Sequence, residues 1–354
     1  MRDAADVGAR LDRGRPGAAR PLSHRLRLAF GIAVSVALLA FLLWTVDRHE
    51  LAVQLARTSW GWVLISVALG LAGLYARAFR WRWLFPPGAP PPGIVPATMI
   101  GYMANNVLPL RAGEVVRVYM AARRLRDANT MTGAQAFWLA AATVVIERVL
   151  DSLALVLILT VLVFITPVPT GVEWAAGVLF VVDILGVVVL VTVARAPQLA
   201  RAVLARLTSR WPRVEQLALG MFETALRGLD GIRTPAHAIR IAAWTPIIWV
   251  LPAAAAWAML RAFHLELPFL AGWVVLAFVG IGISVPSAPG YLGVFHFAAK
   301  LALDVFGVAP STALAYALIY HASAAVPITL VGWLYLVREH VSLGDVRRAP
   351  TPAA

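Results

Sequence analysis

Three charged side chains within residues 105–117 have the types and spacing to bind an anion. Arg111, Glu114 and Arg117 lie three residues apart, so they share one face if a helix restarts near Gly113. A restarting helix also points free backbone N–H groups and its positive dipole end into the break before it. Alternatively, both arginines extend to the aqueous boundary with Glu114 as their partner, and the spacing leaves the two interpretations open.

A second segment breaks an apolar run in the same way. Three residues separate Pro109 from Gly113 in the first segment and Pro289 from Gly293 in the second. Backbone breaks at membrane depth persist only where protein or a wet cavity surrounds them, and paired breaks in two halves of a chain point to a transporter's binding site. We therefore predict that both segments bind substrate. Their further polar or flexible residues are Asn105, Asn106, Ser284, Ser287, Gly290 and His296.

Three more charged residues fall inside the apolar run from Ala134 to Ile165. Glu147 and Asp151 are one turn apart, and Arg148 lies beside them. Each charge at the centre of a span costs about 2.5–3.5 kcal/mol on insertion scales, so these groups must face protein or water. They are candidates for the same substrate site. Because the run is longer than a bilayer requires, the alternative is a structural ion cluster near the inner interface.

Several kinds of chemistry have no support in the sequence. There are no cysteines, which excludes disulfides, thiolate metal sites and cysteine nucleophiles. We find no metal-ligand spacing, phosphate-binding glycine loop or nucleophile elbow. We therefore expect neither a metal nor a cofactor, and the absence of these motifs argues against an enzyme.

The elements that must position these residues are membrane helices. Of the 354 residues, 60% are hydrophobic and 14% are charged, against about 45–50% and about 25% in soluble domains. Residues 94–110 and 289–306 are either spans or re-entrant segments. The expected fold is an all-α polytopic membrane protein with about eight transmembrane helices and two re-entrant or broken segments. Stretches of the length needed to cross a bilayer are Leu28 to Val46, Trp60 to Phe79, Ala134 to Ile165, Trp174 to Ala194, Ile241 to Phe263, Pro268 to Val285 and Ser311 to Val337.

The net charge of +13 is concentrated between the predicted spans. Arginines cluster in residues 1–27, 111–126 and 195–240, whereas residues 166–173 contain no basic side chain. The positive-inside rule puts these clusters, and both termini, in the cytoplasm. An anionic inner-leaflet surface is the partner that such a basic face fits, so the charge requires no nucleic acid.

The chain divides into a membrane domain, residues 23–340, and two short tails. Residues 1–22 and 341–354 are expected to be disordered cytoplasmic tails. Within residues 195–240, apolar side chains recur at four-residue spacing, which predicts either two amphipathic helices on the inner surface or a helical hairpin packed on the ends of the spans. An offset of about 180 residues superimposes the two breaks and suggests an internal duplication.

The three motifs together resemble one family. The order N-x2-L-P-x-R-x-G-E-x2-R, then E-R-x2-D inside a span, then P-S-x-P-G-x-x-G before an aromatic residue is similar to the lysylphosphatidylglycerol synthase transmembrane, or flippase-like, family. The resemblance implies an inner-membrane protein that moves a lipid or lipid-linked substrate between leaflets, with broken helices forming the site. The matching positions are Arg111, Gly113, Glu114, Arg117, Glu147, Arg148, Asp151, Pro289, Gly290 and Gly293.

Two features depart from the family's pattern. The family usually has an acid where this chain has His296. The soluble aminoacyl-transfer domain of some relatives is also missing after Val337, so we do not expect aminoacylation of a lipid.

The expected function is a lipid flippase or transporter for an anionic lipid or lipid-linked substrate. One alternative is a membrane-embedded enzyme that acts on a lipid-linked sugar, with Glu114 or Glu147 as base. Another is a non-catalytic subunit that scaffolds lipid modification. The expected partners are membrane lipids, and the alternatives add a second copy of the chain or an enzyme of lipid biosynthesis.

Overall fold

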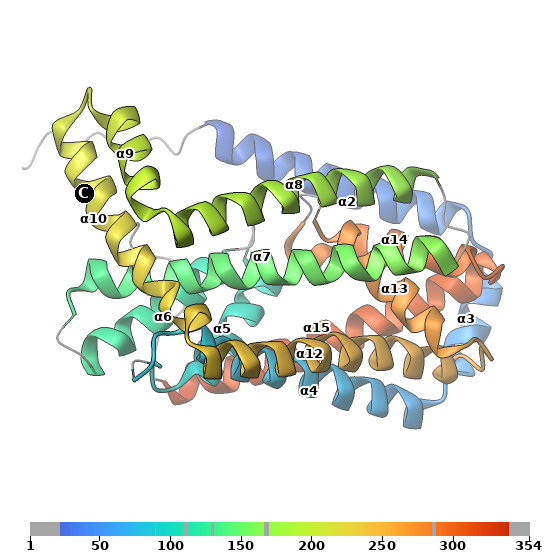
Figure 1. The fold of residues 1–354 in the computed structure, drawn as a ribbon. Helices are drawn as coiled ribbons and strands as arrows, with labels where there is room; N and C mark the ends of the chain where they lie inside the picture. The colour runs from blue at the N-terminus through green and yellow to red at the C-terminus, as the bar shows by residue number, and fades with distance from the viewer. Residues whose placement is uncertain are drawn as a thin grey trace, which may run out of the picture.

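The computed structural model describes residues 22–88, 90–108, 112–128, 131–165, 170–284 and 288–339. Within these ranges all regular elements are helices, which confirms the expected all-α membrane fold (Figure 1). The predicted site residues Arg111 and Ser287 lie outside the described residues. So do the predicted tails, except that the first helix begins at Leu22.

Six helices in the described part of the chain have 23 or more residues. Four of them, α4, α7, α12 and α15, are long and apolar enough to cross a membrane. A fifth span follows if Phe180–Val193 and Pro197–Thr208, which are bent by 105°, are taken together. The six helices are α2 (Leu22–Trp44), α4 (Trp60–Leu84), α7 (Gly133–Ile165), α8 (Thr170–Arg195), α12 (Pro235–Ala262) and α15 (Pro310–Arg338).

Two pairs of shorter helices form re-entrant hairpins between the long ones. α5 (Ile94–Val107) packs on α6 (Gly113–Ala128), and α13 (Phe269–Gly282) packs on α14 (Val294–Asp304). With 14 residues each, α5 and α13 are about 21 Å long, which is too short for a hydrocarbon core of about 30 Å. Each chain segment therefore enters and turns back at its break.

The hairpins change how three of the apolar stretches are used. The stretches around 94–110 and 289–306 belong to re-entrant arms rather than to spans. The stretch from Pro268 to Val285, predicted as a full span, is also such an arm, because its helix ends at Gly282. Hydropathy alone does not distinguish a half-length helix surrounded by protein from a helix that crosses the bilayer.

The helices form two units of opposite direction. The units α4–α7 and α12–α15 share the order long, short, short, long, and equivalent helices start about 180 residues apart, as the sequence offset predicts. α4 and α12 run antiparallel: the Ser59 N–H donates to the Ala262 carbonyl at 2.8 Å, and at the other end Gly231 packs on Leu84. In Figure 1 the first hairpin lies in the half of the bundle near α10 and the second in the half near α3. The repeats therefore have inverted topology.

Each unit has its own hydrophobic core. One buried cluster, which includes Trp81, Ile100 and Leu139, lies among the helices of the first unit. A second, which includes Phe278 and Tyr316, lies mainly among those of the second unit. The units meet chiefly along α4 and α12 and where α15 of the second unit packs on α5 of the first hairpin.

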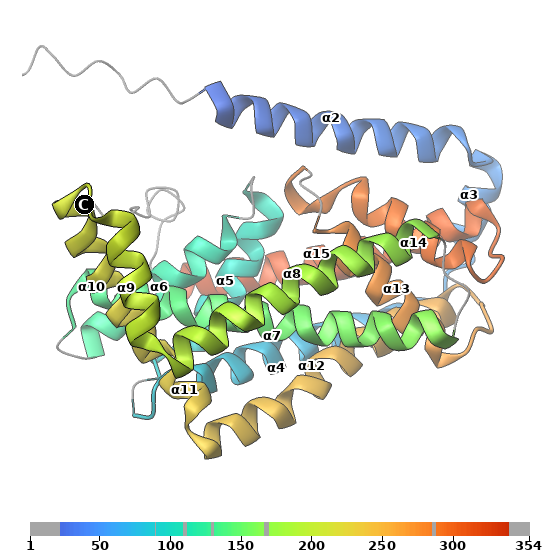
Figure 2. The same cartoon turned by 45° about the horizontal axis from the view of Figure 1, so that its top comes forward.

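The remaining helices lie at the edges of the two units. Figure 2 shows α2 along one side of the bundle, joined to it through α3 (Arg48–Ala56). α9 (Pro197–Thr208) and α10 (Pro212–Gly228) form a helical hairpin, and α10 packs on α7, where Gly228 lies against Ala142. Of the two predictions for residues 195–240, the structure favours the packed hairpin. The short helix α11 (Asp230–Arg233) leads into α12.

Candidate functional site

The two re-entrant breaks meet, although about 180 residues separate them in sequence. α5 packs on the single-turn helix η2 (Pro289–Tyr291) in the second break. A Cβ atom added to Gly290 would lie 3.4 Å from the Asn106 carbonyl oxygen. A cavity of about 340 Å³ at this junction is lined by residues from both breaks, including Val107 and Leu292, and by one face of α15.

The first break, between the end of α5 at Val107 and the start of α6 at Gly113, is called tip 1 and is held by two asparagines. The side-chain oxygen of Asn105 accepts a hydrogen bond from the Gly113 N–H at 2.9 Å and so closes the gap between α5 and α6. The side-chain amide of Asn106 donates to the Ala325 carbonyl at 3.2 Å and to the Thr329 hydroxyl at 3.0 Å, both on α15. The two asparagines thus shape tip 1 and attach it to the other unit.

The second break, called tip 2, runs from the end of α13 at Gly282 into the first turn of α14, and its backbone depends on glycine conformation. Gly290 and Gly293 have φ angles of +69° and +81°, which side-chain-bearing residues rarely adopt. Gly293 also lies against α2, where an added Cβ would be 2.6 Å from the Ser35 carbonyl oxygen. The Ser35 hydroxyl accepts a hydrogen bond from the Ala288 N–H at 3.0 Å. Ser284, a predicted site residue, is exposed and donates to the Gly280 carbonyl of its own helix.

A buried arginine–carboxylate cluster lies between α6 and α7. Both Glu147 oxygens accept from Arg117, at 2.7 and 3.4 Å, and the two side chains are 0% and 2% exposed. Glu114 lies 3.3 Å from Arg117. Arg148 lies within 4 Å of Glu114, Glu147 and Asp151. The sequence motifs at 105–117 and 147–151 therefore form one cluster, buried in protein near the middle of α7.

Two further arginines of the cluster come from α4 and were missed in the sequence. Arg80 is fully buried and donates to Asp151 at 2.5 Å, and Arg77 donates to the other Asp151 oxygen at 2.6 Å. Their signal was available: they are one turn apart at the end of an apolar span, and Arg77 lies within it. The next residue, Trp81, packs its ring 4.4 Å from the Arg117 guanidinium and donates to Thr143 at 3.0 Å.

The cluster has one more positive than negative charge among the described residues. Four arginines (77, 80, 117 and 148) face three carboxylates (114, 147 and 151). Several buried guanidinium nitrogens, including Nε and Nη1 of Arg80 and Nε of Arg117, have no hydrogen-bond partner. Leaving buried donors unpaired is costly, so the cluster has unmet capacity to bind an anion.

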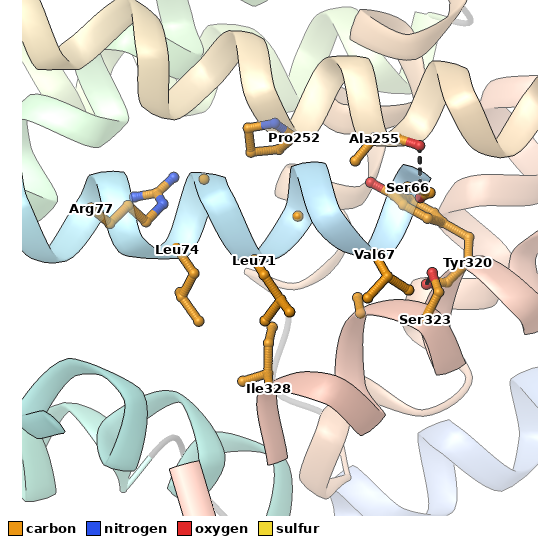
Figure 3. Close-up of a pocket in the computed structure, with 13 residues that line it drawn as sticks. Ser66, Val67, Leu71, Leu74, Arg77, Pro252, Ala255, Tyr320, Ser323 and Ile328 are labelled. Atoms are coloured by element: carbon orange, nitrogen blue, oxygen red, sulfur yellow. Dashed lines mark hydrogen bonds between the residues drawn. The ribbon is translucent and has the colours of Figure 1, made fainter. Parts of the chain in front are cut away.

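A narrow, mostly apolar cavity opens beside the cluster. It measures about 170 Å³ and lies between α4, α12 and α15. Figure 3 shows Arg77 at one end of the lining and Ser66 at the other, with Pro252 on α12 and Ile328 on α15. Because Arg77 lines the cavity and also pairs with Asp151, it connects the cavity to the ionic cluster.

The comparison with protein families identifies the scaffold that holds this site. The family model described as the lysylphosphatidylglycerol synthase TM region matches residues 28–332. The chain belongs to this family. It is therefore a membrane protein related to lipid biosynthesis or transport. Neither a curated protein nor a solved structure gave a match.

The motif residues of this lysylphosphatidylglycerol synthase TM-region protein fall into two groups. Arg117, Glu147, Arg148, Asp151 and, at the edge, Glu114 meet in the ionic cluster. The asparagines, glycines and Pro289 shape the two tips.

His296 lies outside the ionic cluster of this family member. It belongs to tip 2, where it faces His321 of α15 at 3.3 Å. The sequence could not pair these two histidines, because they lie on separate helices.

Proposed function

We propose that the protein moves an anionic lipid, or a lipid-linked substrate with an anionic headgroup, between the leaflets of the inner membrane. The observation that carries this proposal is the contact between two re-entrant tips from oppositely oriented repeat units. In transporters built from inverted repeats, broken helices form the substrate site near the bilayer midplane, and access alternates as one unit moves against the other. Membership of a family tied to lipid biosynthesis or transport supports a lipid as the substrate class.

The excess of guanidinium groups supports an anionic headgroup. In the proposed mechanism Arg77 meets the headgroup in the cavity beside the cluster, and unpaired N–H groups of Arg80 and Arg117 supply further donors. Glu147 and Asp151 hold these arginines in position. The apolar lining along α4, α12 and α15 suits an acyl or prenyl chain next to the headgroup.

The distribution of charge supports an orientation with both termini in the cytoplasm. α9, α10 and the loops around them carry several arginines, including Arg201, Arg206 and Arg227. By the positive-inside rule this end faces the cytoplasm and the anionic inner leaflet. The first hairpin then enters from the cytoplasmic side and the second from the opposite side.

The enzyme alternative receives less support from the same contacts. A general base needs free oxygen lone pairs near the proton that it removes. Both Glu147 oxygens are engaged by Arg117, so Glu147 is better suited to positioning an arginine than to proton abstraction. Glu114 lies within ion-pair distance of Arg117 and Arg148, and its Oε2 accepts no hydrogen bond from the described residues.

Reconstitution into vesicles tests the proposal. The purified protein is placed in phosphatidylcholine vesicles with a small fraction of fluorescent phosphatidylglycerol, and movement between leaflets is followed with a membrane-impermeant quencher. Arg77→Gln removes one donor while Arg80 still neutralises Asp151, so the fold should persist. Loss of a charge-assisted contact worth about 1.5–3 kcal/mol predicts a rate roughly ten- to a hundred-fold lower.

The matched control is Arg201→Gln, because Arg201 is 58% exposed and pairs with Glu223 away from the cluster. This variant should transport like the unmodified protein. Full transport by Arg77→Gln would contradict the assigned role of Arg77. A covalently changed lipid in mass spectra of the vesicles would favour the enzyme instead.

A further inference from the structure

Two buried histidines connect tip 2 to α15. His296, in the first turn of α14, is 3% exposed, and His321 is 9% exposed. The Nε2 atom of His296 and the Nδ1 atom of His321 are 3.3 Å apart, and the rings meet edge to face. Phe295 stacks on His321 with 4.7 Å between ring centroids. The pair is therefore held in one arrangement by its surroundings.

One backbone donor fixes the direction of the hydrogen bonds. The Gly293 N–H donates to Nδ1 of His296 at 3.2 Å. A neutral His296 must then carry its proton on Nε2, which donates to Nδ1 of His321. His321, which accepts at Nδ1, in turn carries its proton on Nε2. This chain of bonds runs from Gly293 through His296 to His321 and is complete when both rings are neutral.

An added proton has no acceptor in this chain. A proton on Nδ1 of His321 would face the Nε2–H of His296. A proton on Nδ1 of His296 would face the N–H of Gly293. In either case two donors point at each other and one hydrogen bond is lost. A single proton therefore breaks the attachment of tip 2 to α14 or to α15.

The described elements around the pair offer little charge to compensate for a proton. α13 contains no titratable residue, and Ser35 is the polar contact that α2 makes with tip 2. Lys300 and Asp304 neutralise each other at 2.8 Å further along α14. The other titratable side chains on α3, α4, α5, α12, α15 and η2 are Arg48, His49 and Glu50 on α3, Tyr75, Arg77, Arg80 and Arg82 on α4, Tyr102 on α5, His237, Arg240 and Arg261 on α12, Tyr291 on η2, and Tyr316, Tyr320, Tyr335 and Arg338 on α15. Of these, Arg77 is already paired with Asp151.

α15 carries the contacts to both tips along one stripe. His321, Ala325 and Thr329 are successive turns of the helix, and the last two bind Asn106 of tip 1. His321 also lines the cavity of about 340 Å³ at the junction, which gives a proton access to the ring. We propose that the His296–His321 pair is a proton-binding site, and that one bound proton releases tip 2 from α14 or from α15 while tip 1 stays attached.

Proton binding at this pair links the proposed transport to a proton gradient, and this link alone rests on the proposed function. If tip 2 opens with each proton bound, lipid movement depends on the pH on the side from which the pair is reached. The tip movement itself can be measured without any substrate.

The test uses the absence of native cysteines. Val107→Cys and Leu292→Cys place one spin label on each tip, at residues that are 49% and 45% exposed and line the same cavity. Distances between the labels are measured in vesicles from about pH 8 to about pH 4, a range that includes the ordinary titration of histidine. The pair variant combines His296→Asn and His321→Asn, since asparagine keeps an acceptor near Nδ1 and takes up no proton. The control is His264→Asn, at an exposed histidine in the loop after α12.

We expect the label distance to increase on acidification in the unmodified background and in the His264→Asn control, and to stay constant in the pair variant. A pH-independent distance in the unmodified background, or the same increase in the pair variant, would overturn the proton site. Vesicle transport is measured in parallel with and without a pH gradient. Tip opening with gradient-independent transport would overturn the coupling, whereas tip opening without any transport would count against the proposed function and leave the proton site standing.

Discussion

The two re-entrant hairpins have the same backbone plan and different chemistry. Tip 1 is closed by an asparagine, and the helix that follows it places Arg117 in a cluster of four arginines and three carboxylates. Tip 2 is held by glycine conformation, by the backbone and hydroxyl of Ser35, and by two histidines. Both units therefore contain a re-entrant hairpin, but in the described part of the chain only the hairpin of the first unit contributes to a cluster of charged side chains.

In the proposed transport cycle the two units therefore have different roles. The first unit supplies the fixed positive groups that meet a headgroup. The second supplies an attachment that a single proton can break. Contacts from α15 join the two, because this helix binds Asn106 of tip 1 and His296 of tip 2.

The largest expected effect is the loss of one partner in the ionic cluster. Arg117→Ala removes the two-bond partner of the fully buried Glu147 and leaves it only Arg148 at 3.4 Å and Arg80 at 3.7 Å, which should cost about 3 kcal/mol in the free energy of unfolding. The double variant Arg117→Ala with Glu147→Ala should cost less than the single one. His321→Ala in the second unit should cost only about 1 kcal/mol, the worth of a neutral hydrogen bond. Chemical unfolding in detergent measures all three, and equal losses for Arg117→Ala and His321→Ala would remove the contrast between the units.

Alanine substitutions at the glycines of the two tips should destabilise the protein for different reasons. In Gly113→Ala the new Cβ would lie 2.0 Å from the Gly101 carbonyl oxygen, so α5 and α6 must move apart, and we expect a loss of about 3 kcal/mol. In Gly290→Ala the new Cβ would lie 3.4 Å from the Asn106 carbonyl oxygen, so the cost is mainly that of the positive φ angle, about 1–2 kcal/mol. The same unfolding measurement distinguishes them. A smaller loss for Gly113→Ala than for Gly290→Ala would mean that the helices of the first hairpin are not in tight contact.

The smallest effect should come from Arg148, which lies beside Glu147 and Asp151 in the predicted substrate site. Its side chain is 42% exposed, and Asp151 is held by Arg77 and Arg80, so Arg148→Ala strands no charge. The expected loss is within about 1 kcal/mol. Adding Asp151→Ala should lower stability further, because Arg77 loses its partner and Arg80 keeps only Glu147, at 3.7 Å. A double variant more stable than Arg148→Ala would show that Arg148 is the main partner of Asp151.

The sequence contained enough information for the class of fold and for the positions of the two breaks. The spacing of Pro109 and Gly113 is repeated at Pro289 and Gly293. Because proline and glycine interrupt helices, this repeat predicted two broken segments and an internal duplication. The sequence did not predict which short apolar helices belong to re-entrant hairpins, because hydropathy reports how apolar a segment is and not where the chain runs after it.

The side-chain partners were harder to predict than the breaks. Arg77 and Arg80 are near the end of a span, where arginines commonly extend to water, so their one-turn spacing marks them as candidates without showing whether they face protein or water. Their pairing with Asp151 depends on the packing of α4 on α7. The pairing of His296 with His321 likewise depends on how tip 2 meets α15.

The central claim, that the two tips form one moving site, is tested most directly by locking them together. The unmodified chain has no cysteine, so Val107→Cys and Leu292→Cys can be joined by a short, cleavable thiol crosslinker in vesicles. A pair at Arg201→Cys and Glu223→Cys, side chains 3.2 Å apart on the α9–α10 hairpin, is the matched control. We predict that crosslinking the tips stops movement of the fluorescent anionic lipid, that cleavage restores it, and that the control crosslink has no effect. Unchanged lipid movement with the tips crosslinked would contradict the account.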